Sequence, residues 1–408
     1  MTAKATWKRY RLAIAALAAV LVLLKFLEPA KGHLSGLDVF STAANSTVKL
    51  VGKNPKSMAA IETRLEYYFP YEPADPVEPS IWQIWKSKLD DQAFPEVAKQ
   101  HVERWRKVND NYNHNLLSMD EAAQVVNDHF KGTASEVVEA LAMLPNERLR
   151  FELLKYLVTF VNGGLYTDID TKCVKPVKHW YETRMGKTNM MVGIANDFND
   201  DSWDKLYTRR LQFSTGTFKA KAHHPFLRKL IARIVHICFT QKVTILETNW
   251  EEVFDHVDAN GEPLLQFTGS VIFTDTLFEY LNGLDNVIFM RVAANDQDKP
   301  KMKVVGPEVP PDVRFSYRQF TGQKAPCQVD DTVIMPLSSF NGIAYEDPDE
   351  LDDKNEKLSG DNKYFYVRHL ALGFWQSKKS EGEMRKLKEK EAELTQEPGT
   401  GQPNVVPS

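Results

Sequence analysis

Asp168 and Asp170, two aspartates with one residue between them, are the side chains of this sequence best suited to chemistry. They follow paired glycines and a short run that begins at Leu165. If this run is an extended strand, alternate side chains share a face, so both carboxylates project into one small volume. Oxygen ligands of this kind suit a hard divalent ion, which keeps other positions open for water and phosphate oxygens. The alternative is an acidic turn at a strand end without a metal.

The elements that position these aspartates follow from hydrophobic spacing. Apolar side chains recur at helical intervals over residues 149–161, after a suitable helix start at Pro145-Asn146. Gly163-Gly164 can adopt the left-handed conformation that ends a helix. The predicted order is therefore helix, glycine stop, strand and carboxylates. This order delivers the aspartates to the C-terminal edge of a sheet strand, where open α/β sheets bind ligands.

Composition limits what such a site serves. With 408 residues, 43% of them hydrophobic, the chain can bury one large core or two smaller ones. A formal net charge of -4 provides no basic footprint for nucleic acid. The three cysteines, Cys173, Cys238 and Cys327, lack the spacing of metal ligands. One disulfide plus a free thiol and three buried thiols are both compatible with the sequence.

The N-terminus has the pattern of a membrane anchor. A basic segment, residues 1–11, precedes an apolar segment, residues 12–27, that only Lys25 interrupts. This pattern predicts a transmembrane signal anchor with a cytoplasmic tail and the remainder of the chain in a secretory lumen. A cleaved signal peptide is the alternative, although a small-residue cleavage site is hard to place. Residues 28–79 are weakly patterned and predict a lumenal stem, which carries the glycosylation sequon at Asn45.

Residues 80–375 alternate between strand and helix patterns. The predicted strands are residues 80–85, 190–194, 211–218 and 332–335, and the predicted helices include 101–108, 118–130 and 226–238. Such alternation predicts an α/β fold with a mixed, mainly parallel sheet covered by helices on both faces. Residues 376–408 predict a charged, solvated helix followed by a disordered tail.

Several longer motifs occur in a fixed order within this region. They are Ile81 to Lys86, Arg150 to Tyr156, Gly163 to Asp170, Lys175-Pro176, Arg209 to Phe213, His224-Pro225, Phe267 to Gly269, Thr274-Asp275 and His369 to Trp375. In this order they resemble glycosyltransferase family 32, and within it the fungal initiation-specific alpha-1,6-mannosyltransferase branch. The resemblance spans roughly residues 80–375. It implies a GT-A type, Rossmann-like domain that transfers a sugar from a nucleotide-sugar donor.

The resemblance also implies roles for the aspartates. Mn²⁺ would connect Asp170 to the donor diphosphate, Asp168 would contact the donor as well as the metal shell, and His369 would complete the metal site. For this branch the donor would be GDP-mannose, and an alpha linkage would retain the donor's configuration. A metal in that position acts as a Lewis acid on the leaving diphosphate. No catalytic nucleophile is assigned.

Donor-binding residues are implied by the same motifs. Arg150 and Lys155 would hold donor phosphates or sugar hydroxyls; alternatively they pair with Glu152 along the helix surface. Glu152 and Lys155 stand where the family more often has Asp and Arg, and Phe374 stands where serine is common. The remaining donor-binding candidates are Gln83, Trp85, Tyr156 and Tyr166.

Two further aspartates are candidate catalytic residues. Asp275 is placed in the first turn of a helix, where the backbone dipole stabilises a carboxylate, and by resemblance it would meet the acceptor or donor sugar. Asp197, in an acidic loop after a strand, would face the cleft. Both assignments depend on these side chains reaching the same volume as Asp168 and Asp170.

Together with the anchor pattern, the resemblance implies a single-pass type II Golgi membrane enzyme with a lumenal catalytic domain, which acts on N-glycans or mannan of glycoproteins. One alternative is a non-catalytic or weakly active structural subunit of a mannan polymerase complex. Another is a related sphingolipid mannosyl- or galactosyltransferase, since the paired aspartates do not distinguish between sugars.

Overall fold

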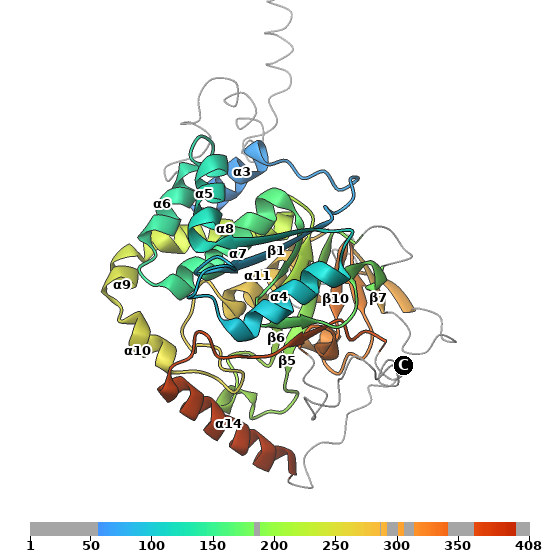
Figure 1. Ribbon diagram of the computed structural model, residues 1–408. Coiled ribbons are helices and arrows are strands. Elements are labelled where there is room, and N and C mark those ends of the chain that lie inside the picture. Colours follow the sequence, from blue (N-terminus) through green and yellow to red (C-terminus); the bar gives the residue numbers. More distant parts are fainter. Residues whose placement is uncertain are drawn as a thin grey trace, which may run out of the picture. The chain divides into compact units, whose positions relative to one another are not determined.

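A mixed sheet forms the centre of the described part of the chain (Figure 1). The structure, a computed structural model, describes residues 56–182, 188–285, 287–291, 301–305, 314–341 and 363–396. The predicted basic tail, the predicted anchor at 12–27 and the sequon at Asn45 lie outside the described residues. Among the helices that are described, none is long and apolar enough to cross a membrane.

Nine described strands build the main sheet in the order β2-β1-β3-β6-β5-β10-β9-β7-β8. Strands β6, β8 and β9 run against the other six, so the prediction of a mixed, mainly parallel sheet is confirmed. The nine strands are β1 Ser80–Trp85, β2 Asn113–Ser118, β3 Gly164–Thr167, β5 Met190–Asp197, β6 Leu211–Ala220, β7 Val287–Arg291, β8 Lys301–Val305, β9 Cys327–Val329 and β10 Thr332–Met335.

A separate two-stranded sheet pairs β4 with β11. Their bounds are Thr171–Cys173 and Val367–His369. The described helices are α3 Met58–Tyr68, α4 Glu96–Val108, α5 Met119–Phe130, α6 Ser135–Met143, α7 Glu147–Asn162, α8 Pro225–Thr240, α9 Lys242–Glu247, α10 Trp250–Asp255, α11 Ser270–Gly283, α13 Tyr317–Phe320 and α14 Lys378–Gln396.

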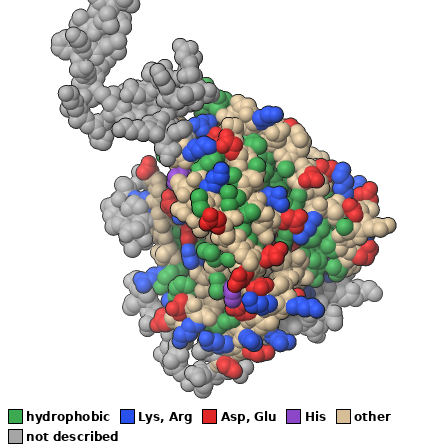
Figure 2. Space-filling view, turned by 90° about the vertical axis from the view of Figure 1, so that its left-hand side faces the viewer, with side chains coloured by type: hydrophobic (Ala, Val, Ile, Leu, Met, Phe, Trp, Pro, Cys, Tyr) green, Lys and Arg blue, Asp and Glu red, His purple; other side chains and the backbone are tan. Residues whose placement is uncertain are grey.

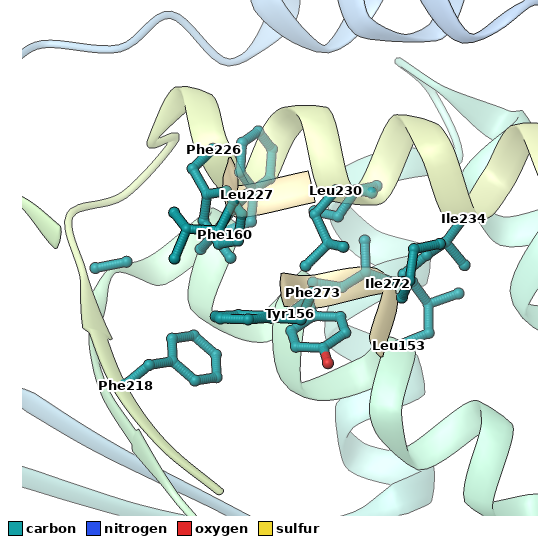
Figure 3. Close-up of a cluster of buried hydrophobic side chains, with 14 of the residues drawn as sticks. Leu153, Tyr156, Phe160, Phe218, Phe226, Leu227, Leu230, Ile234, Ile272 and Phe273 are labelled. Carbon is teal, nitrogen blue, oxygen red and sulfur yellow. The ribbon is translucent and has the colours of Figure 1, made fainter. Parts of the chain in front are cut away.

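Helices cover both faces of the main sheet. Successive strand residues point to opposite sides, so a strand such as β3 packs against both helical layers. In β3, Leu165 packs with Trp105 of α4, whereas Tyr166 packs in the larger core with α7, α8 and α11. Figure 3 shows how side chains of these three helices meet in that core, with Phe218 of β6 beside them. The larger core therefore holds α7 firmly against the sheet, and α7 directly precedes the two aspartates.

The predicted helix before the aspartates is confirmed as α7. The side chain of Asn146 accepts a hydrogen bond from the backbone N–H of Arg148 at 2.8 Å and caps the helix. At the other end, Gly163 and Gly164 adopt φ angles of 65° and 103°, which side chains rarely tolerate. A Cβ on Gly164 would lie 2.5 Å from the carbonyl oxygen of Ser80. The paired glycines thus allow β3 to lie directly beside β1.

Two predicted boundaries differ from the structure. Residues 58–68, assigned to the stem, form α3, which buries Ile61 and Leu65 in the larger core beside α8. Charged residues in α3 conceal this apolar face in the sequence. The predicted charged helix after residue 376 is present as α14, but it is not fully solvated, since the hydroxyl of Tyr207 donates to Glu391.

All three cysteines are buried free thiols. This excludes the disulfide that the sequence left open, because Cys173, Cys238 and Cys327 are all described and none is bonded to another. Burial raises the pKa of each thiol to about 12, so none is poised to act as a nucleophile.

Replacing Gly164 with alanine should lower the free energy of unfolding by about 2 kcal/mol or more, because the new Cβ meets both an unfavourable φ angle and the Ser80 carbonyl. The matched control is Gly283→Ala at the end of α11, where nothing lies within 4 Å of an added Cβ. It should stay within about 1 kcal/mol of the wild type. Urea denaturation measures both, and equal midpoints would contradict the proposed close approach.

Candidate active site

A cavity of about 230 Å³ lies at the C-terminal edge of the main sheet. Its walls include Trp85 at the end of β1, the two aspartates after β3, and the first half of β6 from Gln212 to Gly216. Because β6 runs antiparallel to β3, its first half lies beside the end of β3. The aspartates therefore occupy the edge at which the sequence predicts ligand binding.

The two aspartates lie in a turn and not in a continuing strand. Strand β3 ends at Thr167, and β4 begins at Thr171. The predicted strand through residue 169 is thus too long, because the chain bends to form β4. Ile169 in this turn is buried against Trp85, while the carboxylates on either side of it line the cavity. The turn still brings the two carboxylates together, as the sequence predicts.

A histidine from the far end of the chain joins them. Strand β11 pairs antiparallel with β4, which sets His369 opposite Thr171. Its Nε2 atom lies 3.5 Å from Oδ1 of Asp170. Asp168, Asp170 and His369 each offer a ligand atom, and these atoms lie within 4.8 Å of one another. Within the described residues this is the one group of His, Cys, Asp and Glu side chains close enough to hold a metal ion.

Asp168 is held in place by several hydrogen bonds. The hydroxyl of Tyr166 donates to its Oδ1 atom at 2.7 Å, and its backbone N–H donates to the carbonyl of Gly216 at 2.8 Å. The amide of Gln83 donates to its carbonyl oxygen at 3.2 Å, and the other end of that amide meets His114. Tyr166 and Gln83, which the resemblance assigns to donor binding, do not line the cavity, and both hold Asp168 by hydrogen bonds.

Negative charge at this site lacks full compensation. Burial raises the pKa of Asp168 to about 6; the ammonium of Lys155 opposes the rise, whereas the carboxylates of Asp170 and Glu152 add to it. Two carboxylates and an imidazole, short of positive charge in a partly enclosed cavity, fit a divalent cation. The residues present therefore fit the metal that the sequence predicts, without specifying manganese.

Lys155 belongs to the interior and not to the cavity wall. It is 1% exposed, its ammonium lies 2.7 Å from Glu152, and the rings of Tyr156 and Tyr166 surround it. The pairing with Glu152, left open by the sequence, is the arrangement found. Tyr156 is also buried, and its hydroxyl donates to Glu152. Both residues thus support Glu152, which itself lines the cavity.

Arg148 lines the cavity, and Arg150 does not. On a helix, residues four apart share a face and residues two apart do not, so Arg148 follows Glu152 toward the cavity. Its side chain is 14% exposed, with Nη2 3.8 Å from Glu262. Its Nη1 atom is buried and has no hydrogen-bond partner among the described residues. Because Arg148 lies four residues before Glu152, helical spacing alone would have indicated Arg148 in the sequence.

Aromatic rings form one wall of the cavity. Trp85 lines it as predicted, and its ring lies 5.1 Å from that of Phe374 and 5.7 Å from that of Trp375. Phe374 is the residue that departs from the serine common in the resembling family. An aromatic side chain here extends the apolar wall next to the carboxylates.

Asp197 and Asp275 are not brought to the cavity. Asp197 accepts hydrogen bonds from the hydroxyl of Thr321 and the backbone N–H of Gly322, both at 2.6 Å. Asp275 accepts two from the guanidinium of Arg209, at 2.8 and 2.6 Å. It is the sixth residue of α11, so the predicted first-turn position is wrong. Each carboxylate is satisfied by a structural partner.

Comparisons with known proteins agree with this site. Residues 95–186, which include α7 and both aspartates, match the family described as glycosyltransferase sugar-binding region containing DXD motif. The chain is 29% identical over 328 residues to the initiation-specific alpha-1,6-mannosyltransferase of Candida albicans, covering 78% of this chain and 77% of that protein. The Saccharomyces cerevisiae protein of the same name is 24% identical over 409 residues, covering 80% and 83%.

A solved structure, PaToxG Glycosyltransferase, is also similar, at 17% identity with a TM-score of 0.34, covering 56% of this chain and 76% of that one. This structural likeness is too low to bear on the fold. The sequence matches confirm the predicted resemblance and support an enzyme of the glycosyltransferase class.

Asp168→Asn should stabilise the protein at neutral pH when no divalent ion is added. The folded-state pKa of about 6 exceeds the unfolded value of about 3.9. The stability that this carboxyl contributes is therefore present at low pH and is lost as pH rises from about 4 to 6. The advantage of the asparagine variant should grow across this window and level off above it.

Thermal unfolding across that pH range measures the effect. The control is Asp275→Asn, which removes a carboxylate held by Arg209 and should gain no stability at any pH. Adding Mn²⁺ should stabilise the wild type more than Asp168→Asn. An advantage that is independent of pH would contradict the assigned charge state.

Proposed function

We propose that this protein transfers mannose from GDP-mannose, with the help of a divalent ion such as Mn²⁺, to an N-glycan or mannan acceptor through an alpha-1,6 linkage. The convergence of Asp168, Asp170 and His369 in one cavity is the observation that carries the proposal. The choice of mannose is supported by the names of the relatives, whose similarity extends over more than three quarters of the chain.

In this mechanism Asp170, Asp168 and His369 would hold the ion. When bound, the ion supplies Lewis acidity that offsets charge on the departing diphosphate. Tyr166 and Gln83 keep Asp168 in one orientation, so the carboxylate needs little rearrangement when the donor arrives. The guanidinium of Arg148 supplies positive charge at the cavity wall, suited to phosphate oxygens.

The proposal includes a location. The basic segment 1–11 followed by the apolar segment 12–27 supports a type II anchor in the Golgi membrane with the catalytic region in the lumen. Protease protection of the full-length protein in sealed Golgi vesicles tests this: residues after 56 should be protected until detergent is added. Cleavage in intact vesicles would contradict a lumenal active site.

Asp170→Asn should reduce sugar transfer by roughly 10²-fold or more, because a neutral amide replaces a charged ligand of the ion. The test is a screen of nucleotide sugars with the full-length protein in detergent, with and without Mn²⁺. The control Asp275→Asn should retain transfer within about threefold, since Asp275 pairs with Arg209 outside the cavity. Absence of turnover with every donor would instead favour the structural-subunit alternative.

Arg148→Gln and Arg150→Gln form a matched pair. Removing a charged hydrogen bond to phosphate costs about 1.5–3 kcal/mol, so the Arg148 variant should lose roughly 10- to 100-fold in kcat/KM for the donor. The Arg150 variant should lose much less, because Arg150 does not line the cavity. Initial-rate kinetics with varied donor concentration measure both values. A larger loss for Arg150→Gln would show that the donor reaches the other face of α7.

A further inference from the structure

A second cavity, of about 600 Å³, adjoins the candidate active site. Four residues line both cavities and thus form a shared wall: Arg148, Phe374, Trp375 and Gln376. The second cavity extends from this wall toward α10 and the N-terminal end of α7. The lower part of the face in Figure 2, at the level where α10 and α14 lie in Figure 1, carries interspersed acidic and basic side chains.

The lining of this cavity is acidic, like that of the first, but it lacks the metal-holding group of Asp168, Asp170 and His369. Four carboxylates line it, those of Glu147, Glu251, Glu252 and Asp255, against the two cations Lys86 and Arg148. The formal sum is four negative and two positive charges, or -2, and the ammonium of Lys86 is already paired with Glu147 at 2.9 Å. None of these carboxylates belongs to a metal-holding group among the described residues. With no metal ion to offset these carboxylates, a nucleoside diphosphate would be repelled here, whereas a neutral ligand would not.

The shared wall provides an apolar surface beside these polar groups. Trp375 is fixed from several sides, with its ring 5.7 Å from that of Trp85, 5.2 Å from that of Phe151 and 4.2 Å from the ammonium of Lys86. It remains partly exposed. Phe374 and, from α10, Phe254 add two further aromatic rings to the cavity. A rigid aromatic side chain with carboxylate and amide acceptors nearby fits a sugar, which has apolar C–H faces and a rim of hydroxyl donors.

We propose that the second cavity binds the neutral oligosaccharide acceptor, with Trp375 beneath a sugar ring and Glu251 and Glu252 accepting its hydroxyl hydrogen bonds. This assignment rests on the proposed glycosyl transfer. Because Arg148, Phe374, Trp375 and Gln376 separate the two cavities, a sugar in the second lies next to a donor in the first. The metal-holding group would direct the donor diphosphate to the first cavity, and the acidic second cavity, which lacks such a group, would favour the neutral acceptor.

The double variant Glu251→Gln/Glu252→Gln should raise the KM for a mannose oligosaccharide acceptor at least tenfold, because amides accept hydroxyl hydrogen bonds less strongly than carboxylates. The KM for the donor and the acceptor-independent hydrolysis of the donor should stay unchanged. The matched control is Glu247→Gln/Glu389→Gln, two exposed glutamates outside both cavities, which should alter neither KM. An unchanged acceptor KM in the first variant would overturn the assignment.

Direct binding separates this inference from the proposed function. A linear mannose oligosaccharide titrated into the full-length protein, without donor or metal, should change tryptophan fluorescence, and Trp375→Phe should diminish that change. A phosphorylated oligosaccharide should bind more weakly than its neutral counterpart because of the excess of carboxylates. Binding without any sugar transfer would uphold the cavity and refute the transferase; transfer with equal binding of both probes, or no binding at all, would refute the neutral-acceptor cavity.

Discussion

The organisation of the site depends on buried charge between α7 and the turn after β3. Lys155 is enclosed by aromatic rings, and its ammonium pairs with Glu152. Asp168 lies close enough that Lys155 lowers its pKa and Glu152 raises it. The cavity lining as a whole has four carboxylates against the two cations Arg148 and Lys388. The imbalance persists because the larger core fixes α7 and the paired glycines fix β3. A divalent cation would offset this excess of negative charge.

Local patterns predicted the parts of the fold that depend on nearby residues. Helix α7, its Asn146 cap and its glycine stop follow from spacing within one stretch of the chain. His369 could not be derived in this way, since β4–β11 pairing, which joins residues about two hundred positions apart, brings it to Asp170. Only the resemblance indicated it. The stem assignment failed at α3 because three charged residues, Glu62, Arg64 and Glu66, follow or flank its buried ones and hide the apolar face.

The misplaced aspartates have a similar explanation. Asp275 and Asp197 are acidic residues in plausible motifs, but Arg209 and Thr321, which satisfy them, are remote in sequence. A carboxylate that already accepts two short hydrogen bonds has less capacity to act on a substrate. Arg148 and Arg150 lie on different faces of α7, and a motif match does not show which face lines the cavity. Geometry across α7 therefore decides which cation faces the cavity.

Phe374, which stands where the resembling family more often has serine, affects how the wall between the two cavities selects a sugar. A serine in its place would expose a hydroxyl at the boundary of the two cavities, whereas the phenyl ring packs on Trp85 and continues the surface of Trp375. An apolar boundary excludes water from the carboxylates and strengthens their electrostatic effect on bound charge. It also offers a sugar ring a longer apolar surface but fewer hydrogen-bond partners. Selectivity at this wall must then come from ring shape and from the carboxylates beyond it, Glu251 and Glu252, more than from the wall itself.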